Sequence, residues 1–211
     1  MEDSASIAPM AIARPLGAHR FEAFSPKLAR RVTFFRRPAL EQWLVIEADP
    51  TARTFCERPG CVMLDGQRYL ADFWVRYADR QELITLFDPM AIPADKGAAV
   101  IANPTKPITV RRIETAELAA SRMWVENWQR MLPCLIAARG LIADPLLDDI
   151  VRFVALPQPL LAIEREFSTG DSMLVRAAVF GLLHAGRIQS PALHLEALSL
   201  LTSFVASETV S

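Results

Sequence analysis

The sequence predicts an α/β domain followed by an all-α domain, with the boundary near residue 130. One predicted helix is followed by about four short segments rich in Val, Phe, Tyr, Trp and Thr, separated by turn signals such as Pro59-Gly60 and Asp65-Gly66. From residue 131 onward the chain is rich in Leu and Ala, and its apolar residues have helical spacing. A chain of 211 residues with 52% hydrophobic residues can bury a core in each of two small domains.

The predicted first domain covers residues 14–130 and follows a flexible tail of residues 1–13. It begins with a basic arm over residues 14–37, in which Glu22 is the single acidic residue. A helix should then start near Pro38, which suits a first helical turn, and end before Pro50. Strands are predicted over 51–57, 61–64, 68–76, 82–87 and 108–113, with a short helix over 94–102.

The remaining predicted elements are helices. Residues 115–118, Thr-Ala-Glu-Leu, have the pattern of a helix start, and this helix should continue to about residue 131. Further helices are predicted over 132–139, 145–154, 160–167 and 171–184, with turns at Gly140 and Gly186. Residues 131–211 are therefore predicted to form the helical domain.

The composition excludes several classes of protein. A net charge of −1 and a pI near 6.3 exclude a strongly basic, histone-like protein, although they do not exclude a local basic face. No apolar run reaches the roughly 18 residues that a membrane-spanning helix needs. Cys56, Cys61 and Cys134 form no CxxC pair, so neither a zinc site nor a disulfide framework is indicated. We expect a cytoplasmic protein without a membrane partner.

The basic arm has two interpretations. It is either a solvated arm or a segment that contacts nucleic-acid phosphates, because clustered arginines make bidentate phosphate contacts. Four phenylalanines interleaved with the charges indicate that the arm packs against something. The candidate DNA-binding residues are Lys27, Arg30, Arg31, Arg36 and Arg37.

Two carboxylates carry the strongest chemical signal. Asp72 lies inside an apolar predicted strand, and Glu41 lies on the preceding predicted helix. A charge in such a strand is costly to bury unless it pairs with an opposite charge or binds a cation. Asp72 therefore either pairs with a nearby arginine or belongs to a metal site with Glu41.

Several stretches in order resemble the TnsA family of transposon endonucleases. The first are Phe24-Ser25-Pro26-Lys27, Leu40-Glu41-Gln42-Trp43-Leu44, Glu47-Ala48-Asp49-Pro50, Phe55-Cys56-Glu57-Arg58-Pro59 and Arg68-Tyr69-Leu70-Ala71-Asp72-Phe73-Trp74-Val75. Residues 115–118, followed by Glu126-Asn127-Trp128, continue the series. The resemblance covers roughly residues 20 to 130. It implies a restriction-endonuclease-like mixed sheet flanked by helices, followed by a small winged-helix-like domain. It also implies that the protein binds transposon-end DNA, a transposase subunit and an ATP-dependent regulator.

The resemblance places Glu41 and Asp72 as ligands of Mg²⁺, which prefers hard oxygen donors and activates a water for strand cleavage. The family then carries an "E/Q-V-K-P" ending, where this chain has Leu86-Phe87-Asp88-Pro89. Leu86 offers no metal ligand, and Asp88 reverses the charge of the expected lysine. Glu82 lies about 13 Å along the strand from the ligand position, too far to substitute.

We therefore expect a TnsA-like DNA-binding subunit whose metal-dependent cleavage is lost or impaired. Two alternatives stay open at this point. One is an active but divergent Mg²⁺-dependent endonuclease that uses Glu41, Asp72 and Asp88 as a displaced set of carboxylates. The other is a non-catalytic, winged-helix-type DNA-binding regulator or scaffold, in which the first domain is a relic of the fold.

Overall fold

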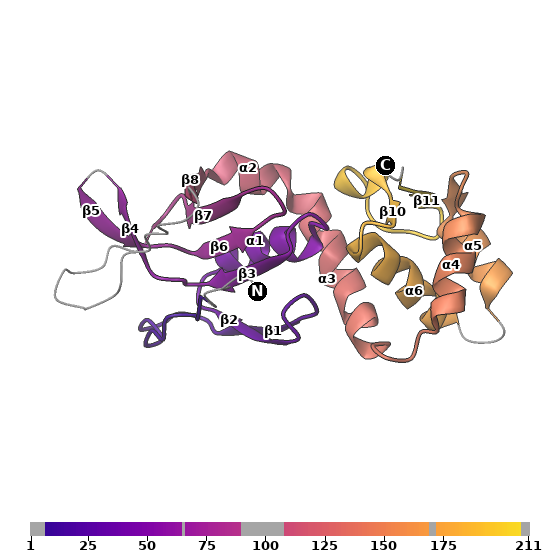
Figure 1. Cartoon of the computed structure of the whole chain (residues 1–211), viewed down its shortest axis with the longest axis horizontal. Coiled ribbons are helices and arrows are strands. Elements are labelled where there is room, and N and C mark those ends of the chain that lie inside the picture. Colours follow the sequence, from indigo (N-terminus) through magenta and orange to yellow (C-terminus); the bar gives the residue numbers. More distant parts are fainter. Residues whose placement is uncertain (1–6, 65, 90–107, 169–171, 208–211) are drawn as a thin grey trace. The chain divides into compact units, whose positions relative to one another are not determined.

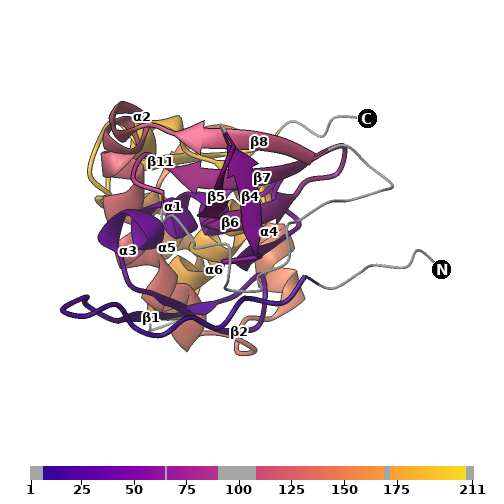
Figure 2. The same ribbon diagram turned by 90° about the vertical axis from the view of Figure 1, so that its left-hand side faces the viewer.

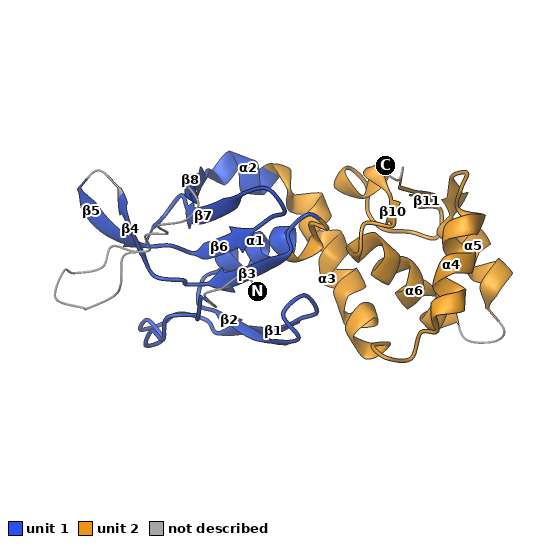
Figure 3. Cartoon of the chain, in the orientation of Figure 1, with its two compact units in different colours: residues 1–46, 51–119 blue, residues 47–50, 120–211 orange. Residues whose placement is uncertain are grey.

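A computed structural model describes residues 7–64, 66–89, 108–168 and 172–207. The chain divides into two compact units, which are coloured separately in Figure 3. Unit 1 comprises residues 1–46 and 51–119, and unit 2 comprises residues 47–50 and 120–211. The sequence predicted the domain boundary near residue 130. In the structure the long segment of unit 2 begins at residue 120, about ten residues earlier.

The predicted basic arm folds into a β-hairpin. Strands β1 (Phe21–Ser25) and β2 (Arg30–Phe34) pair antiparallel, with Phe21 opposite Phe34. Val32 and Phe34 are buried, whereas Arg31 before them is exposed and Thr33 between them is half-buried, which is the alternation of a strand with one buried face. The hairpin lies on the β3 side of unit 1 in Figure 1, and it lies away from β8 in both Figure 1 and Figure 2.

The centre of unit 1 is a mixed four-stranded sheet. Its strands are β3 (Thr54–Glu57), β6 (Phe73–Arg76), β7 (Gln81–Leu86) and β8 (Ile108–Ile113), in the order β3-β6-β7-β8. The first two pairings are antiparallel, and β8 joins β7 in parallel. This arrangement confirms a mixed sheet flanked by helices.

Helix α1 (Arg37–Ala48) begins and ends close to the predicted bounds. Its Trp43 is buried against Phe34, with ring centroids 5.6 Å apart, and Phe34 in turn contacts Phe73 of β6 at 6.0 Å. These three aromatic side chains join the hairpin, the helix and the sheet through one apolar cluster.

The strand predicted over 68–76 is two strands instead of one. β5 (Gln67–Leu70) pairs with β4 (Cys61–Leu64), and β6 follows after Ala71 and Asp72. The predicted turn between β4 and β5 has Gly66 at φ 77°, which suits glycine, and Asp65 lies outside the described residues.

A β-bulge separates the two halves of this long hairpin. Residues 58–60 connect β3 to β4, whereas only Ala71 and Asp72 connect β5 to β6 on the partner strand. Three residues therefore face two, and the extra residue bends the ribbon. Arg58 has a left-handed φ of 49°, and Gly60 has a φ of 146°. The bulge places Asp72 where the regular ladder is interrupted.

The helical segment after β8 breaks earlier than predicted. α2 (Thr115–Ala120) ends before Ser121, and α3 (Arg122–Ala137) continues through the position near 131 where a break was expected. Pro133 lies inside α3. The predicted helix over 94–102 lies outside the described residues.

Unit 2 is not all-α, which corrects the prediction. Its elements after α3 are α4 (Asp144–Phe153), β9 (Gln158–Pro159), α5 (Leu160–Phe167), α6 (Ser172–His184), β10 (Ile188–Gln189), the 3-10 helix Pro191–His194 and β11 (Ser203–Ala206). The three strands form an antiparallel sheet in the order β10-β11-β9. Strands of two residues have too little periodicity to be recognised in a sequence.

Helix α6 is the core of unit 2. It packs against α3, α4 and α5, and most of its residues are buried, Phe180 and Val179 almost completely. A helix that is apolar on every side is stable only when neighbours surround it. Its last residue, His184, bonds through Nε2 to Oε1 of the buried Glu47 at 3.0 Å. Within the described residues, no helix combines the length and apolar character needed to cross a membrane.

Asn127 of α3 holds the loop that precedes β11. Its Nδ2 donates to the carbonyls of Leu193 and Glu196, and its Oδ1 accepts from the backbone N–H of Leu198, each at 2.8 Å. Because Asn127 is 1% exposed, this side chain replaces water for three backbone groups of the loop.

Candidate functional site

Asp72 is the buried charge around which the candidate site is built. Its Oδ1 accepts from Nη2 of Arg36 at 2.5 Å, and its Oδ2 accepts from the backbone N–H of Leu86 at 2.9 Å. The side chain is only 9% exposed. Burial raises the pKa of Asp72, and the opposing effects of Arg36 and of the Leu86 N–H do not cancel that rise.

Arg36 precedes α1 and brings a fixed positive charge to Asp72. Its Nη2 bonds to the Asp72 carboxylate, and its Nη1 donates to the backbone carbonyl of Asp88. The sequence left open whether Asp72 pairs with an arginine, and that pairing is confirmed. A guanidinium therefore neutralises the carboxylate that a divalent metal would otherwise neutralise.

The two residues that depart from the family pattern lie where β7 ends. Leu86 is fully buried, so its side chain belongs to the core, and its contribution to Asp72 is a backbone N–H. Asp88 is exposed, and its negative charge adds slightly to the raised pKa of Asp72. Arg36 thus donates hydrogen bonds to both the Asp72 carboxylate and the backbone carbonyl of Asp88.

Glu41 is engaged elsewhere on α1. Its Oε1 accepts from Nε of Arg37, one helical turn earlier, at 2.8 Å. Across the described ranges, no three His, Cys, Asp or Glu side chains gather closely enough to hold a metal ion. Within that part of the chain, Glu41, Asp72 and Asp88 do not form a three-carboxylate cluster, and the Mg²⁺ site stays a prediction.

The sequence did not reveal a second buried ion pair, between Glu57 and Arg30. Glu57 ends β3 and is 3% exposed, while Arg30 begins β2. The pair is bidentate, with Nη1–Oε1 at 2.7 Å and Nη2–Oε2 at 2.5 Å. The hydrogen bond to Glu57 raises the pKa of Arg30. The apolar neighbours of Glu57 were the only signal, and they did not identify its partner.

The five predicted DNA-binding residues therefore differ in how their charges are used. Arg30 and Arg36 pair with buried carboxylates inside unit 1, and Arg37 pairs with Glu41 on the surface. Arg31 is exposed on β2, and Lys27 lies in the turn between β1 and β2. Of the five, Arg31 and Arg37 are exposed and Lys27 is half-buried, and Arg31 is the exposed cation on the hairpin strands.

Arg58, which the sequence did not single out, lies between the hairpin and the bulge. Its Nη1 donates to the Thr33 carbonyl at 2.5 Å, and its Nε donates to the Met10 carbonyl at 3.3 Å. Its guanidinium carbon lies 5.9 Å from the centre of the Phe35 ring. Burial lowers the pKa of Arg58 more than the nearby Glu57 raises it.

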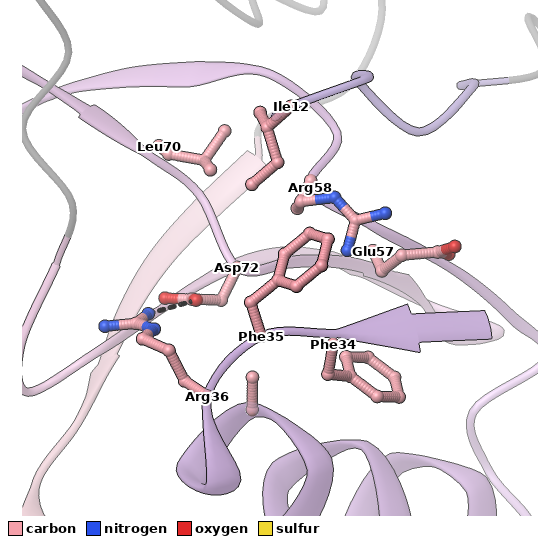
Figure 4. A pocket seen from close by; sticks show the side chains of 9 residues that line it. Ile12, Phe34, Phe35, Arg36, Glu57, Arg58, Leu70 and Asp72 are labelled. Carbon is pink, nitrogen blue, oxygen red and sulfur yellow. Dashed lines mark hydrogen bonds and ion pairs between the residues drawn. The ribbon is translucent and has the colours of Figure 1, made fainter. Parts of the chain in front are cut away.

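These side chains line one cleft. Figure 4 shows the Phe35 ring between Asp72 and Arg58, with Ile12 and Leu70 above it. The lining residues are Ile12, Phe34, Phe35, Arg36, Ala39, Glu57, Arg58, Leu70 and Asp72. The cleft thus has an apolar floor and charged groups on both sides.

Comparison with known proteins adds no identification. No model of a known protein family matches the chain, and no curated protein matches it. The resemblance to the TnsA family, which is carried by the ordered motifs between residues 24 and 128, stays a prediction.

Proposed function

We propose that this chain is a TnsA-like subunit of a heteromeric transposition complex. It binds transposon-end DNA together with a transposase subunit and an ATP-dependent regulator, and its metal-dependent strand cleavage is lost or impaired. The ordered motifs support membership of this family, whereas the residues at the candidate site differ from those of an active endonuclease.

The observation that carries the proposal is the Arg36–Asp72 pair. A metal-dependent nuclease needs carboxylate oxygens that are open to a cation, whereas Arg36 and the Leu86 N–H use both oxygens of Asp72. The side chain of Leu86 has no atom that can ligate a metal, and the carboxylate of Glu41 pairs with Arg37. The donor set present therefore does not fit a divalent metal site, and we derive no cleavage step through one.

The order of elements in unit 2 supports the winged-helix-like assignment. Helix α4, strand β9, helices α5 and α6, and strands β10 and β11 follow one another, with β11 central in the sheet. In this arrangement α6 has the position of a recognition helix. Because α3, α4 and α5 surround it and its exposed residues are Met173 and Leu174, we assign unit 2 to protein contacts.

The β1–β2 hairpin supports DNA binding by unit 1. Arg31 on β2 and Lys27 in the turn supply positive charge, and Arg20, just before β1, is 56% exposed although it pairs with Glu22. Phosphate contacts of this kind position a protein on DNA without reading its sequence. A whole-chain charge of −1 does not oppose such a local contact.

A salt titration tests the DNA-binding part of the proposal. A labelled duplex carrying a blunt end is titrated with the full chain at roughly 50 and 200 mM salt, and affinity should fall steeply between them. Arg31→Ala should weaken binding and lower the salt slope by about one. Arg165→Ala, which removes an exposed arginine of α5, is the matched control and should change neither. Binding that is absent or insensitive to salt contradicts the proposal.

A cleavage assay tests the catalytic part. The same duplex is incubated with the chain, alone and with its partner transposase, in the presence of Mg²⁺ or Mn²⁺. We expect no strand cleavage attributable to this chain. Cleavage that disappears in Asp72→Ala would instead establish the divergent endonuclease.

A further inference from the structure

Residues 7–12, which have no regular secondary structure, form a strap beside the cleft. The backbone N–H of Met10 donates to the Arg58 carbonyl at 2.8 Å, and Nε of Arg58 returns a bond to the Met10 carbonyl. Ile12 lines the cleft, and Ile7 packs against the apolar cluster that contains Trp74. The strap was predicted as part of a flexible tail, yet two hydrogen bonds to Arg58 and the packing of Ile7 hold it.

Arg58 differs from its neighbours in what compensates its charge. Arg30 and Arg36 each meet a carboxylate, whereas the hydrogen bonds of the Arg58 side chain, within the described residues, go to the carbonyls of Met10 and Thr33. Neutral carbonyls compensate a buried guanidinium less well than an anion does. Glu57 acts on Arg58 electrostatically, but within the described residues it forms its ion pair with Arg30, so the Arg58 guanidinium keeps hydrogen-bonding capacity that Arg30 and Arg36 use on carboxylates.

The backbone of Arg58 points the same way. Its φ of 49° lies in the left-handed region, which glycine and asparagine adopt at lower cost than arginine. The bulge thus holds an arginine at a position where a smaller residue would fit the backbone better. Its side chain lines the cleft, with its guanidinium over the face of Phe35.

We propose that the strap is displaceable and that Arg58, once uncovered, binds a backbone phosphate of DNA. The inference rests on the proposed DNA binding and extends it to a site that the strap covers in the free chain. On displacement, the Arg58 guanidinium exchanges the Met10 carbonyl for a phosphate oxygen, and no covalent bond changes.

Competition between strap and DNA has a measurable consequence. Because the Arg58 site takes a phosphate only in the open form, the contribution of this site to the measured affinity scales with the open fraction. A substitution that weakens a closed strap therefore increases this contribution by the factor by which it increases opening. Ile12→Ser removes the apolar contact in the cleft, and we expect about fivefold tighter binding of the duplex.

Three full-chain variants make this test specific. Leu16→Ser is the control, because Leu16 lies just beyond the strap and is fully exposed, and it should leave affinity unchanged. Arg58→Gln should weaken binding and lower the salt slope by about one. Combining Ile12→Ser with Arg58→Gln should give much less than the fivefold gain, because the strap then covers no phosphate site.

Hydrogen exchange of the Met10 amide separates the possible failures. We expect this amide to be protected in the free chain and to lose its protection when saturating duplex is added. Salt-sensitive binding with Met10 still protected overturns the strap, while the proposed function stands. An unchanged affinity in folded Ile12→Ser also overturns it. No salt-sensitive binding by the unaltered chain overturns both the proposed function and this inference.

Discussion

At Asp72, burial outweighs an ion pair. The carboxylate contacts Arg36 and a backbone N–H, and both contacts favour the charged form, yet its pKa is raised because the side chain is removed from water. Such a carboxylate depends on its counter-charge more than a surface carboxylate does. Arg36 is consequently a structural requirement of unit 1 as well as an occupant of the candidate site.

Arg36→Met tests this dependence. Removing the counter-charge leaves a buried carboxylate unpaired, and we expect a loss of about 3 kcal/mol near neutral pH, the lower end for such a change because Arg36 is 25% exposed. The folded pKa of Asp72 is already raised and should rise further in the variant. Protonation removes the unpaired charge, so the loss should shrink towards pH 4.5 or so. Urea unfolding at the two pH values measures it.

Arg37→Met is the matched control, since Arg37 also pairs with a carboxylate but is 77% exposed. Its loss should stay within about 0.5 kcal/mol at both pH values. A loss in Arg36→Met that does not depend on pH would mean that the cost comes from packing rather than from the charge of Asp72.

Single residues were the least predictable part of the site. That Asp72 needs a partner follows from its apolar neighbours, but the sequence offered an arginine and a metal equally. Arg30 and Glu57 lie 27 residues apart, and Met10 and Arg58 lie 48 apart. Such pairs form only when the hairpin, the bulge and the strap come together, so a local sequence pattern cannot predict them.

At the scale of elements, Asn127 links a helix to a loop. Asn127→Ala should cost about 2 to 3 kcal/mol, because it leaves two carbonyls and one N–H of the loop without their buried partner. Protection of the Leu198 amide against hydrogen exchange should fall more than that of the α6 amides. Equal loss at both places would indicate general destabilisation of unit 2 instead of a released loop.

Substitutions at two turn glycines distinguish the cost of backbone strain from the cost of a steric clash. Gly140 and Gly186 have φ values of 77° and 72°. A Cβ at Gly140 meets nothing within 4 Å, whereas one at Gly186 would lie 2.7 Å from Cβ of Pro50. Gly140→Ala should therefore cost about 1 kcal/mol for the backbone alone, and Gly186→Ala clearly more. Thermal unfolding measures both, and equal costs would show that Pro50 yields.

Elements with strong periodicity were predicted best. α1, α5 and β8 lie within about a residue of their predicted bounds, because each has a full apolar face or clear end signals. The hairpin of residues 21–34 was hidden by its charges, although Val32 and Phe34 alternate with polar residues. The strand over 68–76 was predicted as continuous because a bulge depends on the pairing partner, which the strand's own sequence does not specify.

At the scale of the whole molecule, the net charge of −1 conceals an uneven use of cations. Arg30 and Arg36 neutralise buried carboxylates of unit 1, while Arg31 faces solvent on the hairpin. Counting charges along the chain therefore overstates the cations available to DNA. The side chain of Arg58, which the strap covers, hydrogen-bonds to neutral carbonyls, and Glu57 is the nearby anion that acts on it.

The same charge arrangement predicts that DNA binding does not require a divalent metal. In a metal-dependent nuclease the cation links carboxylates to the scissile phosphate, so chelation weakens binding as well as abolishing cleavage. Here Arg36 already supplies positive charge at Asp72. Replacing Mg²⁺ by chelator and NaCl at matched ionic strength should leave duplex affinity unchanged or slightly higher, because Mg²⁺ competes for phosphates. Fluorescence anisotropy measures it; an affinity that collapses on chelation would favour the divergent endonuclease, with Asp72 exchanging Arg36 for metal on DNA.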